Sequence, residues 1–309
     1  MSGIWTQVAP LPAGARVVAL CLAESRPSVL AVSSLRYLTG VALALPITSI
    51  ADSVMVVQGG VAWVTSIFAI YLFNGVTDTV EDRINGSGRP IARGDLHPRT
   101  AAAVAAAAAA LALLATAGLP LAMTWIIAVN LGLGYLYSGP PSPLKASPGG
   151  TVIVLMLSGL LSYLAGFTVA TAGAGLVAPT ELVVFTTAAI CWMVLVGVPA
   201  KDLSDIPGDA AAGRRTLGVR IGESAARRVM VTAAVGLLVA FCVAVAVLDA
   251  RLVGVLVAMA AGVAAVVVAG TRPAGQGRGG SDRRARRRSY EAFMATQQAV
   301  HITAVLSNI

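Results

Sequence analysis

Long apolar stretches recur along the chain and are separated by short polar segments. An α-helix of about 20 apolar residues crosses the hydrocarbon core of a bilayer, which is roughly 30 Å thick. This pattern predicts spans near residues 28–50, 53–76, 100–118, 119–138, 150–172, 180–201, 225–248 and 251–270. A ninth stretch, 290–309, mixes apolar residues with Gln and His, and it either spans the membrane, our preferred interpretation, or lies on its surface. We therefore predict an all-α polytopic membrane protein of about nine transmembrane helices, with residues 1–309 forming a single domain.

Composition and charge agree with a membrane protein. Hydrophobic residues make up 57% of the 309 residues and charged residues only 12%, which is unlike the balance of a soluble domain. The net charge of +8 comes largely from arginines in short connections between the apolar runs. Such a distribution sets the orientation of helices in a membrane. We therefore exclude nucleic-acid binding as the function.

Basic residues occur in alternate connections between the predicted spans. They gather after the second, fourth, sixth and eighth spans, whereas the other connections carry almost none except Arg251. Because positive residues mark the cytoplasmic side, the N-terminus and these connections are predicted to be cytoplasmic, in the cell (inner or plasma) membrane. Residues 1–25 lack the pattern of a signal peptide and are predicted to be a cytoplasmic or interfacial segment. The Arg-rich loop 271–289 is predicted to contact anionic lipid.

A first polar cluster, Asn74, Asp78 and Asp82, closes the second apolar run. On a helix, the spacing of four residues places one amide and two carboxylates on one face. Crowded carboxylates repel one another unless a cation lies between them. Oxygen ligands with room for water and phosphate suit Mg²⁺. These three residues are therefore predicted to be ligands of a Mg²⁺ ion.

A second acidic cluster, containing Lys201, Asp202, Asp205 and Asp209, ends the sixth apolar run. Half of the 14 Asp and Glu residues lie in the two clusters or in the connection that follows the first one. Acidic residues at the ends of membrane spans are costly unless they are paired or bind a metal, so a functional role is the default interpretation. We predict that Asp205 and Asp209 bind a second Mg²⁺ on the same cytoplasmic side as the first cluster.

Two acidic clusters at one membrane face suit an allylic diphosphate as ligand. Mg²⁺ ions that bridge carboxylate and diphosphate oxygens assist departure of the diphosphate, and apolar helices keep water away from the allylic cation. Basic side chains would complete the site through charge-assisted hydrogen bonds. The catalytic candidates are Asp78, Asp82, Asp205 and Asp209, and the diphosphate-binding candidates are Asn74, Arg89, Arg93, Lys145, Lys201 and Asp202. The three cysteines and two histidines are too few and too scattered for a metal centre.

The two clusters and a segment between them resemble the signatures of the UbiA superfamily of intramembrane prenyltransferases. The resemblance is carried by Asn74-x-x-x-Asp78-x-x-x-Asp82 with Arg89-Pro90, by Tyr137-Ser138-Gly-Pro-Pro141 followed by Lys145, and by Lys201-Asp202-x-x-Asp205-x-x-Gly208-Asp209. It implies nine helices around a central cavity capped on the cytoplasmic side, a prenyl diphosphate donor and Mg²⁺-dependent transfer to an aromatic or other lipophilic nucleophilic acceptor. Gly75 stands where many members have Asp or Gln, and Gly197 stands where Tyr is frequent. These departures leave the acceptor open.

Five polar residues within the predicted spans are candidates for the cavity or the acceptor site. Arg36 lies inside the first span, where it either faces the cavity or extends to the membrane interface. Asn130 either faces the cavity or bonds another helix. Tyr135, Tyr137 and Tyr163 either shield a carbocation or anchor the helices at the interface.

Two other functions remain as alternatives. A terpene cyclase on the same scaffold would use the same diphosphate ligands and would need no acceptor. The low aromatic content, 5% of the residues, favours transfer to an acceptor. A carrier for cations is the other alternative, but transport sites generally lie near the middle of the membrane on broken helices, whereas these clusters lie at the ends of spans.

Overall fold

The structure, a computed structural model, describes all residues except 1–11, 49–51, 212, 272–279 and 309. The described residues form helices and connecting turns, with no strand among them. The long helices are α2 (Pro27–Ala42), α3 (Ser53–Thr77), α6 (Pro98–Leu114), α7 (Leu121–Ser138), α8 (Pro148–Ala170), α9 (Thr180–Trp192), α10 (Val198–Ala211), α12 (Glu223–Val247), α13 (Val253–Thr271) and α14 (Gly280–Leu306). The short ones are α1 (Ala13–Glu24), η1 (Leu45–Ile47), α4 (Thr79–Ile84), α5 (Pro90–Arg93), η2 (Leu144–Ala146) and α11 (Leu217–Ile221), and a π-helical segment, η3 (Met193–Gly197), joins α9 to α10. The expectation of an all-α fold is confirmed.

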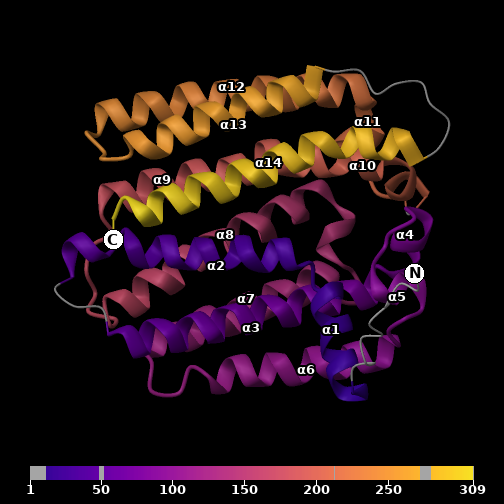
Figure 1. Cartoon of the computed structure of the whole chain (residues 1–309), viewed down its shortest axis with the longest axis horizontal. Helices are drawn as coiled ribbons and strands as arrows, with labels where there is room; N and C mark the ends of the chain where they lie inside the picture. The colour runs from indigo at the N-terminus through magenta and orange to yellow at the C-terminus, as the bar shows by residue number, and fades with distance from the viewer. Residues whose placement is uncertain (1–11, 49–51, 212, 272–279, 309) are drawn as a thin grey trace, which may run out of the picture.

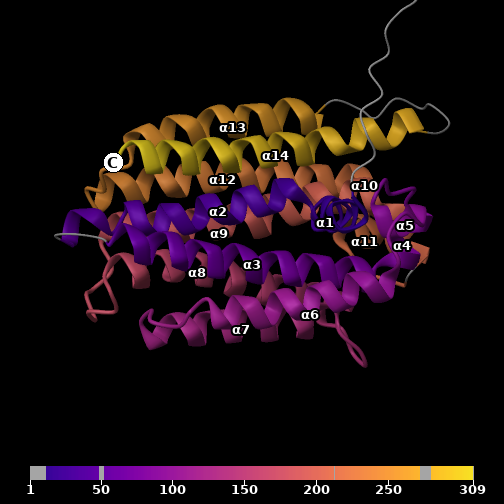
Figure 2. The same cartoon turned by 60° about the horizontal axis from the view of Figure 1, so that its bottom comes forward.

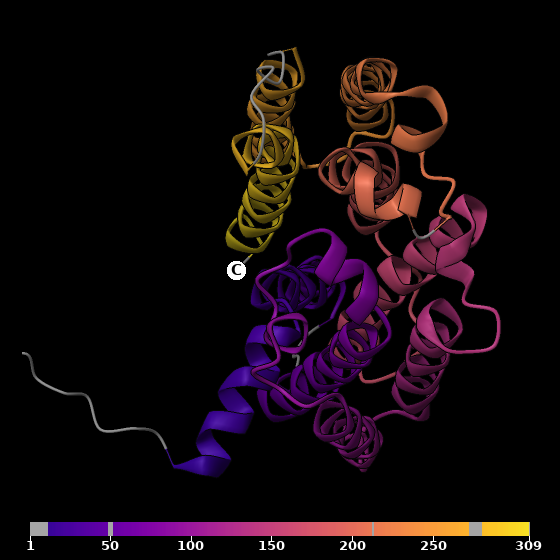
Figure 3. The same cartoon turned by 90° about the vertical axis from the view of Figure 1, so that its right-hand side faces the viewer.

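The long helices lie side by side along one common direction (Figures 1 and 2). The short helices α4, α5 and α11 gather at one end of this bundle, together with the C-terminal part of α10 (Figure 1). Figure 3 looks at the bundle from this side, with the long helices seen nearly end-on. We call this end the motif end, because both acidic clusters lie there.

Seven helices of the described chain are long and apolar enough to cross a membrane. They include α2 extended through η1, and α9, η3 and α10 taken as one helix. Helix α6 is apolar but shorter. Helix α14 runs beside α13 and also contacts α2 and α10, but it is not among the seven, so the spanning of residues 290–309 stays a prediction. The chain is thus a multi-pass membrane protein in which seven of the nine predicted spans meet the requirements for crossing.

Two helix ends differ from the sequence-based expectation, and both lie at the site. Helix α3 ends at Thr77 and α4 begins at Thr79, so Asp78 stands at a break between two helices. The sixth span does not end near residue 201, because the helix continues through η3 and α10 to Ala211 and includes Pro207. The second acidic cluster is therefore part of a helix and not of the connection that follows it.

Glycines bring α2 and α8 into close contact. A Cβ atom at Gly40 would overlap the backbone carbonyl of Tyr163, and one at Gly166 would overlap that of Tyr37. Small residues at such positions let membrane helices approach closely and gain van der Waals contact. This tight pair forms one side of the cavity described next.

Candidate active site

A cavity opens between α2, α3, α7, α8, α10 and α14. The polar and charged residues that line it at the motif end are Arg26, Tyr71, Asn74, Asp78, Tyr137, Lys145, Lys201, Arg214 and Tyr290. Farther along the helices the lining is mostly apolar, with a few polar side chains: Ser33, Arg36, Ser158, Ser162 and Gln297. The cavity therefore combines a charged end with an apolar interior.

Asp78 pairs with two basic residues at the cavity. Lys145 donates to Oδ1 of Asp78 at 2.5 Å and to the hydroxyl of Thr77 at 3.1 Å, and Arg214 Nη2 lies 3.3 Å from the same Oδ1. Burial raises the pKa of Asp78, but the charges of Lys145 and Arg214 outweigh burial and hold it below its ordinary value. Asp78 is therefore an anion on the cavity wall, as a metal ligand must be.

Arg214 joins the two acidic clusters. Its guanidinium lies 2.8 Å from Glu81 and 3.3 Å from Asp78, on the side of the first cluster, and 3.5 Å from Asp209 of the second. A second link is the hydrogen bond from the backbone N–H of Gly208 to Oδ1 of Asn85, at 3.1 Å. Clusters more than 100 residues apart in sequence thus meet at one end of the bundle, as the sequence had indicated.

The second cluster occupies α10. Lys201 pairs with Asp205 one turn later, at 3.3 Å, and the hydroxyl of Ser204 lies 3.1 Å from the same carboxylate. Asp202 and Asp209 are buried, and Oδ2 of Asp209 is a buried oxygen without a hydrogen-bond partner. Lys201 lines the cavity, whereas Asp202, Asp205 and Asp209 lie behind this lining.

These donors fit a hard divalent cation. They are carboxylate oxygens, which Mg²⁺ prefers, and Asp209 has an oxygen that no described group satisfies. Among the described residues, no three His, Cys, Asp or Glu side chains converge closely enough to hold a metal by themselves. Water and substrate phosphate oxygens would supply the remaining ligands, as is common for Mg²⁺.

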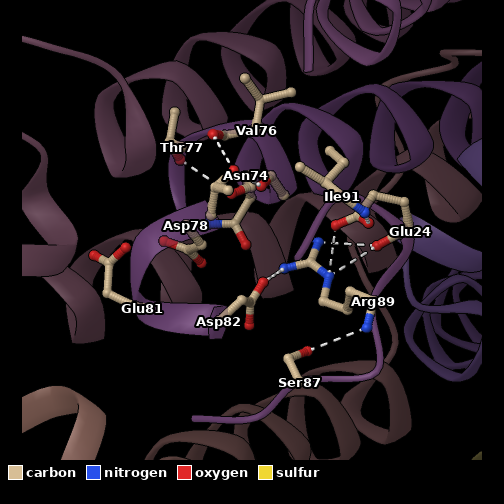
Figure 4. A network of polar contacts seen from close by, with 12 residues as sticks. Glu24, Asn74, Val76, Thr77, Asp78, Glu81, Asp82, Ser87, Arg89 and Ile91 are labelled. Carbon is tan, nitrogen blue, oxygen red and sulfur yellow. Dashed lines mark hydrogen bonds and ion pairs between the residues drawn. The ribbon is translucent and has the colours of Figure 1, made fainter. Parts of the chain in front are cut away.

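Asp82 departs from the single helix face expected for the first cluster. Arg89 Nη1 lies 2.7 Å from Oδ2 of Asp82, and the same guanidinium pairs with Glu24 at 2.8 Å (Figure 4). Asp82 and Arg89 are not among the residues that line the cavity. The break at Asp78 explains the difference, because a one-face alignment requires one uninterrupted helix.

Three predicted diphosphate ligands are placed elsewhere than expected, and one of them, Asp202, is buried and does not line the cavity. Arg89 is buried, and its guanidinium contacts Asp82, the Glu24 carboxylate and the Glu24 carbonyl, so it faces carboxylates and not the cavity. The Arg93 side chain is 55% exposed and pairs with Asp95. Arg93 is not among the residues that line the cavity. Lys145 and Lys201, in contrast, do line the cavity.

The remaining candidates divide into two groups. Arg36 and Tyr137 line the cavity, as does Asn74, which donates to the hydroxyl of Ser138 at 2.9 Å. Asn130 is buried between helices, where it donates to Ser66 and accepts from Ser158. Tyr135 is 53% exposed and stacks on Phe73, and Tyr163 is buried against His301 at 2.7 Å. These last three do not line the cavity.

Several residues at the site were missed as functional candidates, among them Arg214, Arg26, Gln297 and Glu24. Arg214 lies five residues after Asp209, the last residue of the second cluster. This closeness in sequence could have indicated that Arg214 belongs to the site. Arg26 lines the cavity and has a left-handed backbone with φ of 58°, a strain that folds tend to keep at functional positions. Gln297, on α14, lines the cavity and accepts from Arg36 at 2.8 Å, and its Nε2 is buried without a partner. Glu24, the fourth, had no signal beyond its position two residues before Arg26.

The fold and site define a class of protein: a multi-pass helical membrane protein with a largely apolar cavity and two acidic clusters joined at one end. The sequence matches the family described as the UbiA prenyltransferase family over residues 36–295. The chain belongs to this family, which confirms the resemblance stated above.

Solved structures with the same fold come from archaea. A UbiA homolog from Archaeoglobus fulgidus bound to DMAPP and Mg²⁺ aligns with a TM-score of 0.67 at 21% identity, covering 94% of this chain and 99% of that one. The apo structure of a UbiA homolog from Aeropyrum pernix also gives 0.67, at 16% identity, with 90% and 98% covered. At this identity the likeness establishes the fold alone.

Curated relatives match part of the chain. The digeranylgeranylglyceryl phosphate synthase of Halobacterium salinarum is 34% identical over 170 residues, which cover 54% of this chain and 57% of that protein. A probable chloroplastic homogentisate phytyltransferase of Oryza sativa is 29% identical over 158 residues, covering 48% and 40%. The chain thus matches 57% of the length of the first relative and 40% of the length of the second.

Proposed function

We propose that this protein is a Mg²⁺-dependent prenyltransferase that moves a prenyl group from a prenyl diphosphate to an aromatic or other lipophilic nucleophilic acceptor within the membrane. In the reaction, the C–O bond between the prenyl carbon and the diphosphate breaks, and the diphosphate leaves with the electron pair. The acceptor atom forms the new bond to the prenyl carbon and loses a proton. One observation carries the proposal: Arg214 bridges Asp78 and Asp209, and one residue of each cluster, Asp78 and Lys201, lines the same cavity.

The residues at the motif end have distinct roles in this proposal. Asp78, Asp82, Asp205 and Asp209, with Asn74 as a neutral ligand, would hold Mg²⁺, which supplies Lewis-acid assistance to the departing diphosphate. Lys145, Lys201 and Arg214 are the cavity cations that would bind the diphosphate oxygens. The apolar wall beyond them would hold the isoprenoid tail and exclude water.

Arg36 is the cavity residue best suited to bind the acceptor substrate. It lies ten residues after Arg26, and α2 rises about 1.5 Å per residue, so Arg36 is about 15 Å deeper than Arg26. Arg36 donates to Gln297 and to the sulfur of Met193, both of which are uncharged. A cation at this depth is costly unless it serves a ligand. The names of the relatives include both a glyceryl phosphate and homogentisate, and we propose that Arg36 binds the polar head of the acceptor.

The distribution of basic residues supports a cytoplasmic location for the N-terminus and for the motif end, in the cell membrane. Arg26, Lys145, Lys201 and Arg214 all line this end of the cavity. Donor and metal would therefore enter from the cytoplasm.

A substrate screen tests this proposal. The purified protein is incubated with Mg²⁺ and prenyl diphosphates of several chain lengths, with and without aromatic and glyceryl phosphate acceptors, and the products are identified by mass spectrometry. Prenylated acceptor is the expected product. Cyclic hydrocarbons or alcohols formed without acceptor would instead establish the terpene cyclase alternative, and no turnover of any donor would refute both.

A further inference from the structure

Glu24 is a buried acid outside the two clusters. It is the last residue of α1, and its side chain is fully buried. One carboxylate oxygen, Oε1, pairs with Arg89 Nε at 2.8 Å, and the other, Oε2, accepts a hydrogen bond from the backbone N–H of Ile91 at 2.8 Å. Glu24 therefore ties the N-terminal helix to the segment that follows the first cluster.

Arg89 connects Glu24 to Asp82. Its Nη1 donates to Oδ2 of Asp82 at 2.7 Å, and its Nη2 donates to the backbone carbonyl of Glu24 at 2.9 Å (Figure 4). Every nitrogen of the guanidinium thus has a partner, and the planar group is held in one orientation. A guanidinium fixed in this way donates to Asp82 from one nitrogen and in one direction.

The space for the Glu24 carboxylate depends on Gly75. A Cβ atom at position 75 would overlap Oε1 of Glu24 and would also crowd Arg89 Nη2. Gly75 lies on α3, between the Asn74 and Asp78 of the first cluster. The Glu24 carboxylate of α1 therefore occupies the space that a side chain at position 75 of α3 would fill.

We propose that Glu24 is a positioning residue for metal binding, acting through Arg89 to set the orientation of Asp82. This inference rests on the proposed role of Asp82 as a metal ligand. Arg89 engages Oδ2 of Asp82, so Oδ1 is the oxygen that would bind the metal. Without the Glu24 charge, the buried guanidinium would have Asp82 as its one remaining anion. It would turn both terminal nitrogens toward that carboxylate, in the bidentate geometry that arginine prefers, and compete with the metal.

The test compares metal binding by the full-length protein and a Glu24→Gln variant in lipid nanodiscs. Mn²⁺ serves as the probe metal, and free Mn²⁺ is measured by electron paramagnetic resonance. Loss of groups that orient metal ligands lowers metal affinity about 10- to 100-fold, and we expect a change in this range. The Mg²⁺ concentration for half-maximal turnover should rise in parallel, while turnover at saturating Mg²⁺ changes less than about twofold.

Glu223→Gln is the matched control. Glu223 also pairs with arginines, Arg227 and Arg286, both at 2.8 Å, but it lies at the start of α12, and these ion pairs involve neither acidic cluster. Its replacement should leave Mn²⁺ affinity unchanged. Equal Mn²⁺ affinity of the wild type and a folded Glu24→Gln variant would overturn the proposal.

Moving the carboxylate provides a second test. Glu24→Ala should weaken Mn²⁺ binding, and adding Gly75→Asp to it should recover most of the lost affinity, because the new carboxylate starts next to the vacated position. A folded double variant that binds Mn²⁺ no better than Glu24→Ala would overturn the proposal, even if Glu24→Gln fails to fold. The proposed function is judged separately, by whether the wild-type protein turns over any prenyl diphosphate.

Discussion

Replacement of Arg214 by glutamine tests whether one guanidinium holds the two acidic clusters together. The change removes the charge that lies 2.8 Å from Glu81 and 3.3 Å from Asp78, and 3.5 Å from Asp209. The Arg214 side chain is only 16% exposed, so solvent screens these contacts weakly. A lost hydrogen bond to a charged group costs about 1.5–3 kcal/mol. We expect the free energy of unfolding without metal to fall by about 2 kcal/mol.

Added Mg²⁺ should reverse much of this loss. A cation that binds the folded state at 100 times its dissociation constant contributes about 2.7 kcal/mol, which is similar to the expected loss. Thermal unfolding with and without Mg²⁺, followed by tryptophan fluorescence, measures both effects. The Mg²⁺-induced rise in melting temperature should be larger for Arg214→Gln than for the wild type, and turnover should fall at least about tenfold because the diphosphate loses a cation.

Arg215 offers the control, because it is adjacent in sequence and its side chain is exposed. Arg215→Gln should change neither the melting temperature nor turnover. If Arg214→Gln keeps wild-type stability and shows no extra stabilisation by Mg²⁺, the bridge has no energetic importance and the reasoning fails.

Three further predictions concern the metal, the second cluster and the acceptor. Chelation of divalent cations by EDTA should abolish prenyl transfer and Mg²⁺ should restore it; transfer that persists in EDTA would contradict the metal role. Asp209→Asn keeps the shape of the side chain but removes its charge, so turnover should fall about 100-fold or more with little change in melting temperature, whereas Asp249→Asn, in the turn between α12 and α13, should be neutral in both assays. Arg36→Gln should raise KM for the acceptor about tenfold and leave KM for the donor unchanged, and an equal rise in both would place Arg36 in the diphosphate site instead.

The sequence was informative about features set by length and composition. Apolar runs long enough to cross a bilayer became long helices, because membrane helices satisfy all their backbone hydrogen bonds internally. The expected meeting of Asp78 and Asp209 was also correct in outline, as their common pairing with Arg214 demonstrates. The order and spacing of the acidic clusters therefore indicated which parts of the chain lie together.

The sequence was less informative about the direction in which individual side chains point. Asp82 was expected on the face of Asn74 and Asp78, but the helix break at Asp78 turns it toward Arg89. Arg89 was expected to bind diphosphate, but it pairs with Glu24 of α1, a contact across 65 residues that no local pattern reveals. Sequence spacing does not predict the partner of a side chain when the possible partners lie on distant elements. In that case the partner is set by how the helices pack.

The π-helical segment Met193–Gly197 accounts for the placement of the second cluster. A π-helix adds residues relative to an α-helical turn, and one extra residue rotates everything that follows by about 100°. Met193 and Gly197 line the cavity, and so does Lys201, one α-helical turn after Gly197. Phe293 of α14 packs against Gly197, where a Cβ atom would overlap its ring. The glycine therefore lets an aromatic ring from another helix form the cavity wall, while the π-helical segment sets which face of α10 turns toward the site.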